Sequence, residues 1–256
     1  MYNATISELK KGTLNSYKGN WGGVIKANII PIITSVMTGF SISSAILVAI
    51  FHTKAITHAA SNPIDAMSPQ FTSGTQAAGN FLWTAIVVFI AVGIQYGILD
   101  LLKRKNQPIG FRTAFQAFTK KYFVSTLAIY ILQFIFFIGW GILSIPTLGI
   151  LYLAKTLAYS QSYLIYKDAS DLGVAEKYEY VNFITFSRQL MDGNKWRFFL
   201  VQLSTFGWWL LGAVTFGIAF IWVTPYQTGV FTNFYKDLAE KQGAKKVPEV
   251  FGTITE

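Results

Sequence analysis

The stretch 198-FFLVQLSTFGWWLLGAVTFGIAFIWVTPYQTGVFTNFY-235 decides the fold, because it contains no charged residue from end to end. A helix rises 1.5 Å per residue, so about 20 residues cross the roughly 30 Å hydrocarbon core of a bilayer. The stretch is too long for one crossing. It fits two short membrane spans, 198–214 and 216–235, joined by a tight turn near Gly212–Gly217.

Four further apolar segments extend this pattern, at 28–51, 81–102, 122–143 and 147–166. The last two form a second hairpin with Pro146 at its tip, where proline starts a helix well and continues one badly. Only 13% of the chain is charged, against about 25% in soluble domains. The sequence therefore predicts an all-α, polytopic membrane protein with six transmembrane helices.

The basic residues test this topology. If the N-terminus is cytoplasmic, nineteen of the 21 lysines and arginines fall in 1–27, 103–121, 167–197 and the tail after 235. Only Lys54 lies outside, and Lys155 lies within a span. The positive-inside rule then predicts a multi-pass plasma-membrane protein with both termini cytoplasmic. A nucleic-acid-binding protein would have to carry its basic residues on six apolar helices, so that alternative is disfavoured. The N-terminus lacks the apolar region of a cleavable signal peptide.

Three cytoplasmic segments are expected to form amphipathic helices lying in the membrane interface, each followed by two spans. The first begins with the capping box Thr5-Ile6-Ser7-Glu8. In each segment, apolar residues recur at helical spacing, and Gly193 is placed to end the third helix. The recurring residues are Ile6, Leu9, Thr13 and Tyr17; Phe111, Phe115 and Phe118; and Val174, Tyr178, Val181 and Thr185. The alternative is that these segments are ordinary solvated connectors.

A short motif recurs before the first and fifth spans. Lys18-Gly19-Asn20-Trp21 precedes one, and Gly193-Asn194-Lys195-Trp196 precedes the other. This recurrence indicates one membrane domain with three repeats, 1–102, 103–166 and 167–236, followed by a cytoplasmic tail at 237–256. The middle repeat lacks the motif. Interfacial anchoring is the simpler explanation of the tryptophans.

The stretch Leu190-Met191-Asp192-Gly193-Asn194-Lys195-Trp196, with several others, closely resembles a bacterial membrane protein family, domain of unknown function 975. The most specific part of the likeness is the Leu-Met-x-Gly-x-Lys-Trp stretch at 190–196. Further parts include Tyr159-Ser160-Gln161-Ser162-Tyr163, Leu203-Ser204-Thr205-Phe206-Gly207-Trp208, Trp222-Val223-Thr224-Pro225-Tyr226 and, near the N-terminus, Ser7-Glu8-Leu9-Lys10 and Gly19-Asn20-Trp21. The chain departs from the family at Pro146-Thr147-Leu148-Gly149, where the family has Pro-Gly directly. The resemblance implies a multi-pass plasma-membrane protein and no assigned activity.

Lys155 is the residue most at odds with its predicted surroundings. It falls near the middle of the fourth span, where a lysine costs about 2.5–3.5 kcal/mol. It could bind an anionic substrate or headgroup, or it could be an interhelical hydrogen-bonding or snorkelling residue. We expect an intramembrane polar site of Lys155, Tyr159, Gln161 and Gln202, although such amides more often join helices than bind substrates.

Pro225 lies inside the sixth span, where it should kink the helix and free carbonyl groups. Kinked helices mark transporter sites, but they also serve as packing devices. His52 and His58, with only Asp65 nearby, make a poor metal site, so neither metal nor cofactor is expected. The chain has no cysteine, and the standard catalytic and nucleotide-binding motifs are missing. The acidic residues of 168–192 are expected on a solvated, salt-bridged face.

These patterns favour a non-enzymatic accessory or protective envelope protein, acting in export or in resistance to membrane-active peptides. Its partners would be the lipid bilayer and a membrane protein of unidentified kind, not nucleic acid. The alternative is a permease for a small solute or ion that uses Lys155, Gln161 and the Pro225 kink. An enzyme acting on lipid would need an acid–base pair that the sequence does not offer.

Overall fold

The computed structural model describes residues 3–51, 74–103 and 108–252, and within these ranges the chain forms helices and turns without strands. Helices α6 (Gly74–Lys103), α7 (Phe123–Leu143) and α11 (Lys195–Val214) are long and apolar enough to cross a membrane. Helices α2 (Trp21–Ala27) and α3 (Ile29–Phe51) meet this standard only as a pair, bent by 71°. The all-helical prediction is confirmed. Among the described residues, three helices could cross a membrane, or four if the bent pair counts as one span.

The fourth predicted span is not one helix. Helix α8 (Ile150–Tyr159) ends before Ser160, and α9 (Ser162–Asp171) begins a separate helix. A continuous helix over 147–166 was therefore a wrong prediction. Helix α12 (Phe220–Leu238) covers most of the sixth predicted span, with Pro225 inside it and Lys236 in its last turn.

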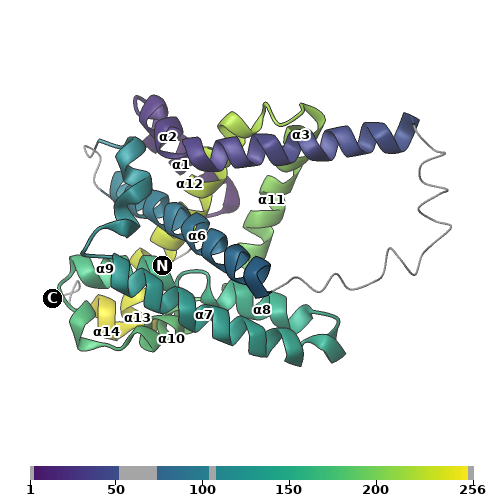
Figure 1. Cartoon of the computed structure of the whole chain (residues 1–256). Coiled ribbons are helices and arrows are strands. Elements are labelled where there is room, and N and C mark those ends of the chain that lie inside the picture. Colours follow the sequence, from purple (N-terminus) through teal and green to yellow (C-terminus); the bar gives the residue numbers. More distant parts are fainter. Residues whose placement is uncertain (1–2, 52–73, 104–107, 253–256) are drawn as a thin grey trace.

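Helix α12 is the centre of the fold and packs against α3, α6, α11 and α1 (Ile6–Tyr17) (Figure 1). The predicted capping box of α1 is confirmed. The Thr5 N–H donates to Glu8 Oε2 at 2.7 Å, and the Glu8 N–H donates to Thr5 Oγ1 at 3.2 Å. The apolar side of α1, with Leu9 and Tyr17, is buried. It faces protein, because α12 covers it.

Helix α1 approaches α12 closely at Gly229. The Tyr17 hydroxyl donates to the Pro225 carbonyl at 3.0 Å, and Asn233 Nδ2 donates to the Leu9 carbonyl at 2.9 Å. The two helices therefore run antiparallel. A Cβ added at Gly229 would lie 2.1 Å from Tyr17 Oη, so only glycine leaves room for this tyrosine.

The second predicted interfacial segment is a 3₁₀ helix, η1 (Phe111–Phe118), packed on α6. Gly93 and Gly97 make this contact possible, because a Cβ on Gly97 would lie 1.8 Å from Thr113 Cγ2. The rings of Phe111, Phe115 and Phe118 remain exposed. The segment therefore presents an aromatic face away from the protein.

The third predicted interfacial helix is divided. A short 3₁₀ turn, η3 (Ala175–Lys177), is followed by extended backbone at Tyr178 and Glu179, and α10 (Tyr180–Leu190) begins after it. The chain after α12 continues through η4 (Ala239–Gly243), α13 (Ala244–Lys246) and α14 (Pro248–Phe251). Val250 and Phe251 are buried in the main core. The predicted tail is therefore packed onto the helices as far as it is described.

The two predicted hairpin tips are confirmed as turns. The α7–α8 tip contains η2 (Ile145–Thr147), then Leu148 and Gly149 with φ of 49° and 83°. The α11–α12 turn contains Phe216 and Gly217 with φ of 53° and 89°. In both turns a residue with a side chain adopts the left-handed region next to a glycine, which reverses the chain within a few residues.

Gly229→Ala should destabilise the protein by about 1–3 kcal/mol, because the new methyl group overpacks the contact with Tyr17. Thermal unfolding of the purified protein in detergent would measure the change. Gly207→Ala on α11 is the matched control, since a Cβ added there would meet no neighbouring atom within 4 Å. Equal unfolding temperatures for the two variants would contradict the close packing of α1 on α12.

Candidate functional site

Lys155 lies on α8, and its ammonium group sits over the Trp140 ring, 3.9 Å from the ring centroid. The lysine is half-buried. Trp140 Nε1 donates to Tyr159 Oη at 2.9 Å, so the indole connects two of the predicted site residues. A cation over an aromatic face is attracted by the electron-rich ring without any carboxylate. The partner of Lys155 is therefore an aromatic ring from α7, which sequence reasoning missed.

Gln161 lies at the break between α8 and α9, with its side chain buried. Here Ser187 of α10 replaces the helical hydrogen bonds. Its Oγ accepts from the Gln161 N–H at 3.1 Å and donates to the Ala158 carbonyl at 2.7 Å. Gln133 Nε2 of α7 donates to the Tyr159 carbonyl at 3.1 Å. Side chains of neighbouring helices thus satisfy the backbone where the helix is broken.

The predicted site is only partly brought together. Tyr159 and Gln161 lie next to the break, and Lys155 lies one turn before it. Gln202 lies on α11, and its side chain forms no hydrogen bond to this group in the described part of the chain. Pro225 lies on α12, and its carbonyl accepts the Tyr17 hydroxyl rather than a group of the site. The kink at Pro225 stays a prediction.

The Gly-Asn motif adopts the same turn at both of its occurrences. Gly19 and Gly193 have φ of 80° and 71°, and Asn20 and Asn194 have φ, ψ of −119°, 3° and −112°, −2°. Each asparagine N–H donates to a carbonyl three residues earlier, at 2.9 and 3.0 Å. The glycine is needed for the positive φ that ends one helix before the next begins. Helix α10 therefore ends near Gly193 as predicted, although its C-cap residue is Met191, two residues earlier.

Lys195 and Trp196 open α11. Trp196 is 68% exposed and stacks on Phe199, with 5.2 Å between ring centroids. The tryptophan therefore faces outward, and the family motif contributes Asn194 and the turn to the interior.

A buried ionic cluster at one end of the helices escaped sequence reasoning. The Lys167 side chain on α9 is 3% exposed and pairs with Asp100 of α6 at 3.0 Å and Asp171 at 2.6 Å. Burial lowers the pKa of Lys167, but the hydrogen bonds to Asp171 and Asp100 outweigh it and hold the pKa above its usual value. Lys167 is therefore a charged residue fixed between two carboxylates.

Asp168 extends the cluster to two more helices. It accepts from Lys103 of α6 at 2.7 Å and from the Tyr235 hydroxyl of α12 at 2.7 Å. Lys121, which precedes α7, pairs with Asp171 at 3.2 Å. The cluster therefore joins the ends of α6, α9 and α12 and the start of α7. The expectation of a solvated face was wrong for Asp168, which is 4% exposed, because helix packing encloses it.

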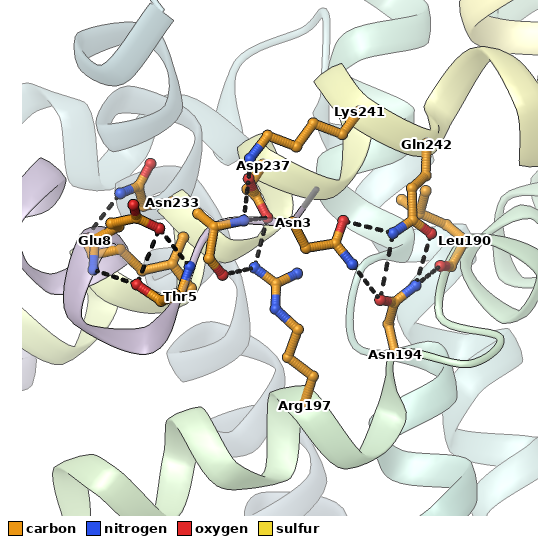
Figure 2. Close-up of polar contacts among 12 residues, drawn as sticks. Asn3, Thr5, Glu8, Leu190, Asn194, Arg197, Asn233, Asp237, Lys241 and Gln242 are labelled. Carbon is orange, nitrogen blue, oxygen red and sulfur yellow. Dashed lines mark hydrogen bonds and ion pairs between the residues drawn. The ribbon is translucent and has the colours of Figure 1, made fainter. Parts of the chain in front are cut away.

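A second polar cluster holds the N-terminal segment (Figure 2). Asp237 near the end of α12 accepts the Ala4 N–H at 3.1 Å and Arg197 Nη2 at 2.5 Å, and it pairs with Lys241 at 2.7 Å. Arg197 Nη2 also donates to the Ala4 carbonyl at 2.5 Å. The Asp237 carboxylate thus binds the Ala4 N–H, and the Arg197 guanidinium binds the Ala4 carbonyl.

Three amide side chains complete this cluster. Gln242 Nε2 donates to Asn3 Oδ1 at 2.7 Å, and Asn194 Nδ2 donates to Gln242 Oε1 at 2.9 Å. Figure 2 shows the Asn3 side chain facing both of these residues, which also bond to each other. The N-terminal segment, the α10–α11 turn and the end of α12 therefore meet at one place.

A cavity lies between α6, α7, α8 and α9. Its volume is about 620 Å³. Gln133, Tyr130 and Tyr163 contribute polar groups to a wall made mainly of aromatic rings. Lys155 is not part of this wall, so the lysine and the cavity are separate features.

No group of three or more metal-ligating side chains occurs within 3–51, 74–103 and 108–252. The His52, His58 and Asp65 candidates lie outside the described residues.

Asp237→Asn should release the N-terminal segment and lower stability by about 3 kcal/mol, because it leaves Arg197 without its buried partner.

Burial raises the pKa of Asp237, but the hydrogen bonds to Lys241, Arg197 and Ala4 outweigh it, so the pKa is below the usual value. The stabilisation is complete above about pH 3.9, the unfolded value, and is lost as the pH falls through the folded pKa.

Tryptic cleavage after Lys10 and Lys11 would report this release at neutral pH. Glu240→Gln is the control, since its pair with Lys236 is long at 3.7 Å and its side chain is 55% exposed. Cleavage of Asp237→Asn at the rate of the control would show that Asp237 does not hold the segment.

Comparison with known proteins gives one match. A family model described as "Protein of unknown function (DUF975)" matches residues 150–242. The matched part covers α8 to α12 and includes the residues of α9, α11 and α12 that belong to the two polar clusters. Neither the curated proteins nor the solved structures contain a match. Over residues 150–242 the resemblance to the DUF975 family is confirmed, and that family is one of unknown function.

Proposed function

We propose that this chain is a multi-pass plasma-membrane protein in which three helical hairpins return to one cytoplasmic face that also carries both termini. The meeting of four basic segments supports this most directly. Residues 1–27, 103–121, 167–197 and the chain after 235 all contribute to the two polar clusters. Segments in direct contact lie on one side of a membrane, so the chain between them crosses it an even number of times or not at all.

The chain between these contacts is apolar. Helices α3 and α6 form the first proposed hairpin, α7 with α8 and α9 the second, and α11 and α12 the third. Many large apolar side chains on α7 and α11 face outward, among them Ile142 and Val214 at 65% and 77% exposure. Exposed apolar surface of this extent is unfavourable in water and favourable in lipid. The proposal is therefore six membrane segments, of which the fourth, at 147–166, is broken between α8 and α9.

We assign this protein a non-enzymatic accessory or protective role in the envelope, in export or in resistance to membrane-active peptides. The carboxylates of the buried Asp100 and Asp168 and of the more exposed Asp171 are each held by a lysine. Groups engaged in this way hold helices together instead of turning over a substrate. The outward apolar faces of α7 and α11 offer contact surface to lipid or to a membrane protein partner.

A permease is the second candidate, favoured by the broken helix beside Lys155. Discontinuous helices form the substrate sites of many transporters. Lys155 pairs with no carboxylate among the described residues, and Trp140 alone compensates its charge. A small anion could therefore displace the lysine from the ring.

Deletion of the gene in its own host should raise sensitivity to membrane-active peptides, and re-expression of the Lys155→Met variant should restore resistance, because the accessory role does not use that charge. Growth across a peptide panel measures both outcomes. Unchanged sensitivity on deletion would remove the protective role. Loss of solute uptake in Lys155→Met, with folding intact, would favour the permease instead.

A further inference from the structure

The cavity between α6, α7, α8 and α9 has the composition of a ligand site. Its volume of about 620 Å³ lies within the usual range for small-molecule sites. Rings of Phe81, Phe134 and Phe137 line it, and no charged side chain is among its lining residues. An apolar body therefore fits this cavity, whereas a charged group would find no counter-charge there.

Two buried polar side chains reach this cavity without a full set of partners. Gln133 and Tyr163 are each only 9% exposed. Gln133 donates to the Tyr159 carbonyl, but its Oε1 atom and the Tyr163 hydroxyl form no hydrogen bond within the described ranges. By contrast, the Tyr130 hydroxyl donates to the Phe81 carbonyl at 3.3 Å. Neither atom is fully enclosed by protein, so the free Gln133 acceptor and the free Tyr163 hydroxyl are open to a ligand with matching groups in this cavity.

We propose that this cavity binds a neutral lipid of the diacylglycerol type. The Tyr163 hydroxyl donates to an ester carbonyl, Gln133 Oε1 accepts from the free glycerol hydroxyl, and the phenylalanine rings contact an acyl chain. A phospholipid has a phosphate in place of that hydroxyl, and its charge has no partner here. This assignment rests on the proposed membrane placement of α6 and α7.

The ligand reaches the cavity from the side of the helices. Phe134 and Ile138 on α7 are 43% and 52% exposed and also line the cavity. The wall is therefore continuous with the outward apolar face of α7. A lipid can enter from the surrounding bilayer without passing through water.

Photo-crosslinking of the full chain in vesicles tests the assignment. A diazirine-labelled diacylglycerol is compared with phosphatidylglycerol carrying the same label, and mass spectrometry locates the adducts. Diacylglycerol should label peptides of α6 and α7 around Phe81 and Phe134. Tyr163→Phe and Gln133→Leu should each reduce this labelling about three- to tenfold, the loss of one hydrogen bond.

Matched controls separate this effect from general damage. Tyr226→Phe and Gln202→Leu make the same substitutions outside the cavity and should leave labelling unchanged. Thr84→Trp fills the cavity with a side chain and should abolish labelling there while the protein remains monodisperse.

Equal labelling of the cavity by both lipids, or full labelling of Tyr163→Phe and Gln133→Leu, would overturn the diacylglycerol site. Failure of any lipid to label the outward faces of α7 and α11 would instead overturn the membrane placement itself.

Discussion

The structure depends on the pairing of charges that the helices enclose. Lys167 is almost fully buried, and an uncompensated ammonium group there would be strongly destabilising. Its pair with Asp100 requires the end of α6 to lie against α9, whereas Asp171 comes from α9 itself. Asp168 binds Lys103 and Tyr235 in turn, so α12 joins the same place. These ion pairs and hydrogen bonds therefore bring the ends of α6, α9 and α12 together.

The N-terminal segment belongs to this same polar end. Asp237 and Arg197 bind the backbone of Ala4, and α1 then runs antiparallel to α12 as far as Pro225. Helix α12 is therefore enclosed by elements from both ends of the sequence. The helices are thus held by polar contacts at one end and leave apolar surfaces along their length.

Local signals in the sequence predicted local structure well. The capping box at Thr5 and Glu8, the turn at Gly193 and the two hairpin tips depend on residues adjacent in the chain, and each was confirmed. Long apolar runs likewise predicted α6, α7 and α11, because length and composition alone determine that a helix can cross lipid.

Features that depend on distant residues were beyond sequence reasoning. The break after Tyr159 is stabilised by Ser187, 26 residues from Gln161, and no local pattern identifies that partner. Lys155 meets Trp140 because α7 and α8 pack together, which the sequence alone does not specify. Asp168 looked solvent-exposed among mixed charges, yet the partners that enclose it come from α6 and α12.

The most direct test of the account is labelling of single cysteines in the otherwise cysteine-free chain in intact cells. A membrane-impermeant maleimide should modify Leu148→Cys at the exposed α7–α8 tip from outside. Lys177→Cys and Lys245→Cys should react only after the cells are opened. Modification of either lysine position from outside would contradict the meeting of four basic segments on one cytoplasmic face.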